Sequence, residues 1–286
     1  MSPTTSTAAA ATTGATATLD RRARPLDFAG ASVVLSGGDR GIGRAVAAAF
    51  ARAGADVLIV SDVEAVHDAA AELDAAGRGD GEDGAGRGVR DAGHRPAGRV
   101  RGAVADVTDP DALERALASV RTVDVLVSNA GIELPTALDD SGDDVRATFR
   151  RVIDVNLVGC ENLVRAALPR LADGGRVLVT SSIWGKTSVA GFSAYAASKH
   201  ALIGLARTWA RELGARGITV NAVSPGFVEA DMTDVLPEAQ KEKLRGEIAL
   251  GRLGKPEDIA DVVAFLASDD ARWLTGENIT ASGGIR

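Results

Sequence analysis

Short, continuously apolar runs alternate with longer segments of helical periodicity along most of this chain, and this alternation restricts its fold more than any other feature. An apolar run of about four to eight residues bounded by polar turns predicts a strand that is buried on both faces. The predicted strands are Ser32–Leu35, Asp56–Val60, Val100–Val104, Val123–Val127, Arg176–Thr180, Ile218–Val223 and Asn278–Ala281. The predicted helices are Gly43–Ala53, Glu64–Ala76, Asp109–Val120, Asp143–Leu171, Ala194–Leu213 and Pro256–Ala267. This pattern predicts an α/β protein with a single, doubly wound parallel sheet and helices on both faces.

The length of 286 residues suits one large α/β domain, and we expect residues 28–286 to form it. Residues 1–27 are rich in Ala and Thr and lack the early positive charge and apolar stretch of a secretory signal, so we expect a disordered tail or an upstream start codon. The segment Gly77 to Arg99 holds eight Gly and five Arg with almost no apolar residue, which predicts a mobile surface insertion. A contact of its arginines with a phosphate or an acidic carrier protein is the less favoured alternative.

Charge and composition argue against several classes of function. The net charge of −7, with no clustered basic face, predicts no nucleic-acid partner. No apolar run reaches the roughly 18 residues that span a bilayer, so no membrane partner is expected. Cys160 is the only cysteine and lies among apolar residues, which predicts a buried free thiol and a cytoplasmic location. His67, His94 and His200 lack metal-ligand spacing, so we expect no metal site.

A glycine-rich string, Ser36–Gly43, follows the first predicted strand and opens the first predicted helix. Gly37 permits a tight turn, Gly41 lets the backbone approach a phosphate, and Gly43 lets helix and strand pack closely. The start of the helix then offers unpaired N–H groups and a partial positive charge. The string therefore predicts a site for the phosphates of a dinucleotide.

Tyr195 and Lys199 are four residues apart in a predicted helix, so their side chains project from one face. A phenol has an ordinary pKa near 10, and a neighbouring ammonium is expected to lower that pKa towards the working range of a proton donor or acceptor. Tyr195 is also the only tyrosine of the chain. We therefore predict that this pair carries out acid–base chemistry.

These motifs, in this order, resemble the short-chain dehydrogenase/reductase family, whose glycine string is Thr-Gly-x3-Gly-x-Gly with Ser36 here in place of the Thr. Asp106-Val107, Ser128-Asn129-Ala130-Gly131 and Pro225-Gly226 match further motifs after later strands. The resemblance covers roughly Leu26 to Gly284 and implies a Rossmann fold that binds NAD(P)(H). The residues that it implies for the dinucleotide are Ser36, Gly37, Arg40, Gly41, Ile42, Gly43, Ser61, Asp62, Asp106, Val107, Asn129, Ala130, Gly131, Tyr195, Lys199, Pro225, Gly226 and Val228.

The same resemblance implies the catalytic residues. Tyr195 would exchange a proton with the substrate oxygen while a hydride moves between the nicotinamide and the carbon. Ser182, thirteen residues earlier, would orient that oxygen; Ser181 is a rival on chemistry alone, but the family spacing selects Ser182. Asn156 matches the helical Asn that holds a water linking Lys199 to solvent.

Two departures from the family pattern concern the cofactor. Ser61 stands where NAD-using members carry an acid, and Arg40 resembles NADP-using members, whereas Asp62 opposes an additional phosphate. The balance slightly favours NADP(H) over NAD(H). The family's Thr after Pro-Gly is Ala230 here, and Thr233 could compensate for its loss.

The stretch from Gly217 to Gly284 looks most like the β-ketoacyl carrier-protein reductase branch. We therefore expect a ketoreductase for a small ketone, free or bound to a carrier protein; an enoyl reductase would place more residues between Tyr and Lys. The alternatives are an NAD-dependent secondary-alcohol or sugar-alcohol dehydrogenase and, less favoured, a non-catalytic cofactor-sensing protein. The resemblance also implies a homotetramer or homodimer. Trp184, Phe192 and Phe227 would either line an apolar substrate pocket or pack in the core.

Overall fold

A computed structural model of the chain describes residues 26–78, 98–140, 142–229 and 237–285. Seven parallel strands form one sheet in the order β3-β2-β1-β4-β5-β6-β7. The strands are β1 (Ser32–Ser36), β2 (Asp56–Ser61), β3 (Val100–Val104), β4 (Val123–Ser128), β5 (Leu171–Thr180), β6 (Thr219–Pro225) and β7 (Asn278–Ala281). The helices are α1 (Gly41–Arg52), α2 (Val66–Arg78), α3 (Pro110–Leu117), α4 (Asp143–Ile153), α5 (Gly159–Ala167), α6 (Ser193–Leu213), α8 (Glu238–Glu247) and α9 (Pro256–Ala267). The predicted doubly wound parallel sheet is confirmed.

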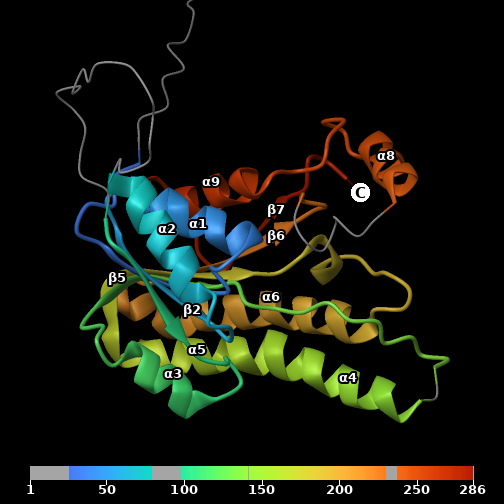
Figure 1. Cartoon of the computed structure of the whole chain (residues 1–286), viewed down its shortest axis with the longest axis horizontal. Coiled ribbons are helices and arrows are strands. Elements are labelled where there is room, and N and C mark those ends of the chain that lie inside the picture. The colour runs from blue at the N-terminus through green and yellow to red at the C-terminus, as the bar shows by residue number, and fades with distance from the viewer. Residues whose placement is uncertain (1–25, 79–97, 141, 230–236, 286) are drawn as a thin grey trace, which may run out of the picture.

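Helices cover both faces of the sheet, with α1, α2 and α9 on one side and α3, α4, α5 and α6 on the other (Figure 1). Alternate residues of β1 pack against the two helical layers, because successive side chains of a strand point to opposite faces. Val33 and Leu35 pack in the cluster of α1 and α9, whereas Val34 packs in the cluster of α3, α5 and α6. A central strand such as β1 therefore has no polar face, which explains its continuously apolar sequence.

The direction of winding reverses between β1 and β4, which are neighbours in the sheet although β2 and β3 lie between them in the sequence. In open α/β sheets, a crevice forms at such a switch point outside the carboxyl ends of the strands, and ligands bind there. Ser36 ends β1 and Ser128 ends β4, and the two residues are register partners. The segments that follow them are the glycine-rich string and the Asn129–Gly131 motif.

One predicted helix, Asp143–Leu171, is divided in the structure. A π-helical turn at Asp154–Val158 separates α4 from α5, and a short 3₁₀ turn follows α5 at Leu168–Arg170. Such π-helical turns are rare and often lie at functional sites. Apolar periodicity continues through the turn, so the sequence does not report it.

Two other elements differ from the predictions. β5 begins at Leu171 because that residue pairs with Val123 of β4 before an irregularity in the register. The helix α8 was not predicted, since its sequence is dominated by charged residues and only Leu244 is buried in it. A helix with so little apolar surface gives no periodic pattern.

The ends of the predicted insertion belong to the fold. α2 continues to Arg78, and the chain returns at Gly98, where an added Cβ would lie 1.8 Å from the carbonyl oxygen of Ala55. Residues 79–97, the remainder of the predicted insertion, lie outside the described residues. The same holds for residues 1–25 of the predicted tail, whereas Leu26 already packs against the core.

Candidate active site

The glycine-rich string forms a tight loop between β1 and α1. Gly37 and Gly41 adopt positive φ angles of 66° and 51°, which L side chains rarely adopt. A Cβ on Gly37 would lie 2.9 Å from the Cα of Ala130. The side chain of Arg40, the residue before α1, does not cap the helix, and the first turn of α1 contains no acidic residue. The start of α1 therefore presents N–H groups and a partial positive charge to an anion.

The Ser36 hydroxyl joins the two loops at the switch point. Its Oγ accepts hydrogen bonds from the backbone N–H groups of Asn129 and Ala130, each at 3.1 Å. The Asn129 side chain donates to the carbonyl oxygen of Gly37 at 2.9 Å. Ser36 is fully buried, so its hydroxyl holds the loop after β4 through hydrogen bonds that solvent does not reach. Ser36 and Asn129, both predicted for the cofactor, thus join the glycine-rich loop to the loop after β4.

Asp106 follows β3 and carries a constrained carboxylate. Its Oδ1 accepts hydrogen bonds from the N–H and hydroxyl of Thr108 at 2.8 and 2.7 Å, and Arg151 lies 3.6 Å from its Oδ2. Burial raises the pKa of this carboxyl, but the Thr108 hydrogen bonds and the charge of Arg151 outweigh it, and the net pKa is lowered. The neighbouring Val107 is buried. Asp106 is therefore an ionised acceptor at the predicted adenine side.

The residues that bear on cofactor choice differ in exposure. Ser61, the last residue of β2, is buried, whereas the next residue, Asp62, is exposed, as is Arg40 in the glycine-rich loop. Asp62 is thus the carboxylate that solvent reaches at the end of β2. Arg40 is the exposed cation on the neighbouring loop.

Tyr195 and Lys199 lie on one face of α6, and both are buried. The Lys199 Nζ lies 5.5 Å from the centre of the Tyr195 ring and donates a hydrogen bond to the carbonyl oxygen of Thr180 at 2.9 Å. Thr180 ends β5, so the ammonium is held at the carboxyl edge of the sheet. The predicted juxtaposition of the two side chains is confirmed.

The predicted lowering of the Tyr195 pKa is wrong for the protein alone. Burial raises the pKa of this phenol, the Glu133 carboxylate raises it further, and a hydrogen bond with Ser182 acts in the opposite direction. Burial also lowers the pKa of Lys199 to about 8, against smaller effects of Cys160 and Glu133. Desolvation disfavours the charged form of either group, and it is the largest influence on both pKa values.

The structure separates the two adjacent serines. The Ser181 hydroxyl donates to the carbonyl oxygen of Lys199 at 2.8 Å and so holds α6 against the end of β5. The Ser182 Oγ accepts the N–H of Trp184 at 3.2 Å, which leaves its proton for another acceptor, and it interacts with the Tyr195 phenol. This geometry favours Ser182 over Ser181 as the residue that contacts a substrate oxygen.

Asn156 lies in the π-helical turn and fastens the loop after β4. Its Oδ1 accepts the N–H of Ile132 at 2.8 Å, and its Nδ2 donates to the Ile132 carbonyl at 2.9 Å and to the Ser198 hydroxyl at 3.1 Å. A Cβ on the adjacent Gly131 would lie 3.3 Å from the Lys199 Nζ. Asn156 therefore connects this loop to α6 close to Tyr195 and Lys199.

The aromatic residues gather around Trp184. Its ring centre lies 5.9 Å from that of Tyr195 and 6.0 Å from those of Phe192 and Phe227. Trp184, Phe192 and Phe227 are half-buried, so they pack together and still present apolar surface beside Tyr195. The two readings of these residues, as core or as pocket lining, are therefore compatible.

The last predicted motif follows β6. Pro225 ends that strand, and a Cβ on Gly226 would lie 2.8 Å from the Cα of Ser282, which follows β7. Val228 is buried beside Gly254. The predicted departure at Ala230 and its compensation by Thr233 lie outside the described residues.

Comparisons with known proteins agree with this geometry. A family model described as enoyl-(acyl carrier protein) reductase matches residues 81–286. The 3-oxoacyl-[acyl-carrier-protein] reductase of Salmonella typhimurium is 35% identical over 266 residues, which cover 91% of this chain and 99% of that protein. The (3R)-3-hydroxyacyl-CoA dehydrogenase of Mus musculus is 39% identical over 272 residues, which cover 92% and 99%. A crystal structure of a 3-oxoacyl-[acyl-carrier protein] reductase with bound NAD from Brucella melitensis has a TM-score of 0.76 and 31% identity, covering 91% of this chain and 94% of that one.

The chain belongs to the short-chain dehydrogenase/reductase family. It is therefore an oxidoreductase that acts on carbonyl or secondary-alcohol carbons with a nicotinamide dinucleotide, and it has the Rossmann fold of that family. The predicted family, fold and reaction class are confirmed.

Sequence reasoning missed one residue at the centre of this short-chain dehydrogenase/reductase. Glu133, half-buried in the loop after β4, acts electrostatically on both Tyr195 and Lys199. Burial raises the pKa of its own carboxyl, and the charge of Lys199 acts in the opposite direction. Its position two residues after the Asn129–Gly131 motif was the only signal available in the sequence.

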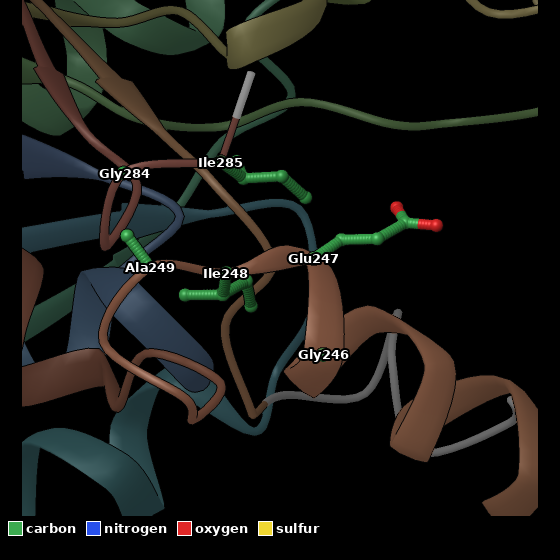
Figure 2. Close-up of a pocket in the computed structure, with 6 residues that line it drawn as sticks. All are labelled: Gly246, Glu247, Ile248, Ala249, Gly284 and Ile285. Atoms are coloured by element: carbon green, nitrogen blue, oxygen red, sulfur yellow. The ribbon is translucent and has the colours of Figure 1, made fainter.

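A pocket of about 490 Å³ lies between the end of α8 and the C-terminal segment. Figure 2 shows the residues around it. The residues that line it are Gly246, Glu247, Ile248, Ala249, Gly284 and Ile285. None of the predicted site residues lines this pocket. Its Ile248 and Ile285 belong to an apolar cluster against which Phe227 also packs, so the pocket and the aromatic group share a packing contact.

Among the described residues, no group of three or more His, Cys, Asp or Glu side chains is arranged to hold a metal ion. In the same part of the chain, no helix is both long and apolar enough to cross a membrane.

Proposed function

We propose that this protein reduces a 3-oxoacyl thioester to the 3-hydroxyacyl thioester with NADPH, and that Tyr195 donates the proton. The observation that carries the proposal is the buried Tyr195 phenol, which lies beside Lys199 and interacts with Ser182 at the carboxyl edge of the sheet. The two relatives described above act, by their names, on acyl thioesters of a carrier protein and of coenzyme A. Both names describe interconversion of an oxygen function at the third carbon.

The loops at the switch point fit a dinucleotide. The uncapped start of α1 suits its phosphates, and the exposed Arg40 stands beside that start. In this proposal Asp106 accepts a hydrogen bond from the adenine, and Gly131 leaves room beside Lys199 because a side chain there would press on the ammonium. When bound, the nicotinamide supplies the hydride that the carbonyl carbon receives.

The side chains of the protein manage the oxygen and its proton. Because its pKa is raised, Tyr195 remains protonated and can donate from Oη to the substrate oxygen. Ser182 donates a hydrogen bond to the same oxygen and stabilises the negative charge that develops there. Lys199 holds one of its three protons on the Thr180 carbonyl, which leaves two for ribose hydroxyls and for returning a proton to Tyr195. We also propose that Asn156 supports a water that links Lys199 to solvent.

An acyl substrate suits the surface beside Tyr195. Trp184, Phe192 and Phe227 offer apolar area to an acyl chain. The adjoining pocket of Figure 2 extends this surface along Ile248 and Ile285.

For the cofactor we propose a preference for NADP(H). The buried Ser61 cannot bind both ribose hydroxyls as an acid would, and Arg40 supplies a cation for an additional phosphate. The exposed Asp62 favours the second candidate, an NAD-dependent secondary-alcohol dehydrogenase. Initial rates with NADPH and NADH on one substrate distinguish the two candidates, and faster turnover with NADH would overturn the preference.

We also propose that the protein forms a homotetramer or a homodimer. Several large apolar side chains are exposed, among them Phe149 and Val158 on the α4–α5 side and Phe265 and Trp273 near the C-terminal end. Exposed apolar surface of this kind supports the proposal where it forms a contiguous subunit contact. Light scattering on the full chain tests the proposal, and a monomeric mass would refute it.

The decisive experiment replaces Tyr195 with Phe. NADPH oxidation with acetoacetyl-CoA should fall by roughly 10²–10⁴-fold, because the proton donor is lost. Binding of NADPH, followed by its fluorescence, should stay close to wild type because the ring remains. Near-normal turnover by Tyr195→Phe would refute the assignment. Ser182→Ala tests the second proposed role, and Ser181→Ala is its matched control. The Ser181→Ala variant should retain more activity than Ser182→Ala.

A further inference from the structure

The loop after β4 brings a carboxylate to the catalytic pair along a fixed path. Gly131 passes so close to Lys199 that an added Cβ would lie 3.3 Å from the Nζ. Both backbone groups of Ile132 are hydrogen-bonded to the Asn156 side chain, and the Ile132 side chain packs against the cluster that contains Tyr195. The next residue, Glu133, therefore extends from an immobilised peptide, and it is half-buried.

The groups that act on Tyr195 and Lys199 come from three segments outside α6. Glu133 acts from the β4 loop on both Tyr195 and Lys199, the Cys160 thiol acts from α5 on Lys199, and Ser182 acts on Tyr195 from the end of β5. Lys199 and Tyr195 themselves come from α6. Within the described residues, Glu133 is the only carboxyl that shifts the pKa of Tyr195 or Lys199. Its negative charge attracts the ammonium and repels a phenolate.

We propose that Glu133 is a positioning residue that keeps Tyr195 protonated and Lys199 charged, and so extends carbonyl reduction to higher pH. The inference rests on the proposed role of Tyr195 as proton donor. Reduction needs the neutral phenol, whose O–H bond breaks as the proton passes to the substrate oxygen. Oxidation of the alcohol needs the phenolate to take that proton back. A fixed negative charge makes the phenolate less favourable. Reduction therefore persists to a higher pH, and oxidation begins at a higher pH, while the overall equilibrium of the reaction is unchanged.

The test exploits the single tyrosine of the chain. Incorporation of tyrosine labelled with ¹³C at Cζ alone gives one resonance, whose chemical shift reports ionisation of Tyr195 without any measurement of turnover. We expect Glu133→Gln, which preserves shape and removes the charge, to lower the midpoint of this titration by about one pH unit, alone and with NADP⁺ added. The limiting pH of acetoacetyl-CoA reduction and the onset of 3-hydroxybutyryl-CoA oxidation should both move down by the same amount.

Asp139→Asn is the matched control, because Asp139 is an exposed carboxylate in the same loop and its loss should leave both profiles unchanged. Glu133→Asp should restore most of the wild-type midpoint. A lower rate without a displaced pH profile would show that Glu133 is merely structural and would overturn the inference. So would a Glu133→Gln phenol that titrates no lower than the wild-type phenol before the fold is lost. Retained activity in Tyr195→Phe would instead refute the proposed function itself.

Discussion

Replacing Gly43 with Ala tests the construction of the cofactor loop. A Cβ at this position of α1 would lie 1.9 Å from the carbonyl oxygen of Gly37 and 2.7 Å from the Asn129 Nδ2. Ordinary van der Waals contact begins near 3.4 Å, so the first of these atoms must move by about 1.5 Å. The two atoms are also donor and acceptor of one hydrogen bond, and the added methyl group therefore separates them.

The expected change in stability is the balance of three effects. Overpacking a close contact costs about 1–3 kcal/mol, and loss of the hydrogen bond between Asn129 and Gly37 costs about 1 kcal/mol. The higher helix propensity of Ala returns about 1 kcal/mol. The free energy of unfolding of Gly43→Ala should therefore fall by about 1–3 kcal/mol. The control Gly204→Ala, at an exposed position of α6 with no atom within 4 Å of an added Cβ, should instead be stabilised by about 0.5–1 kcal/mol.

Urea unfolding followed by tryptophan fluorescence, at one fixed protein concentration, measures both changes. Titration with NADPH measures the second consequence, since the displaced loop should bind the dinucleotide at least about tenfold more weakly, a loss of about 1.4 kcal/mol. If Gly43→Ala gains stability as Gly204→Ala does and binds NADPH normally, the close approach of α1 to Gly37 is not what requires glycine.

Three further outcomes follow from the contacts. Ser36→Ala should destabilise the protein by about 1–3 kcal/mol because two backbone N–H groups lose their buried acceptor, whereas Ser36→Thr should not, as thermal unfolding of both variants would show. Hydrogen bonds from Arg252 hold the pKa of Asp258 at about 2, so its carboxylate stabilises the fold above the unfolded pKa near 4 and loses this effect as the pH falls to about 2. The melting temperature of Asp258→Asn should therefore lie below wild type at pH 7 and meet it near pH 2. Burial raises the pKa of the Cys160 thiol to about 11, so a disulfide reagent at pH 8 should label it in urea but not in the native protein; rapid native labelling would contradict its burial.

The sequence by itself determined the architecture, because strands and helices impose their own periods on apolar residues. β3 and α9 have the predicted bounds, and β1 and β2 differ from theirs by one residue. The glycine string and the Tyr195/Lys199 pair could also be predicted from the sequence, since the first depends on local backbone conformation and the second on residues one helical turn apart. Where a segment lacked apolar residues, as in α8, the same reasoning found nothing.

Only the tertiary structure decided the hydrogen-bond partners, the burial and the pKa shifts of the site residues. The π-helical turn around Asn156 is held by hydrogen bonds to Ile132 and Ser198, which are remote from it in sequence. The Tyr195 phenol lies in a buried position where desolvation and the Glu133 charge raise its pKa, although its neighbour on the helix is a cation. Burial and long-range charge depend on which distant segments meet, and no spacing within one helix encodes that.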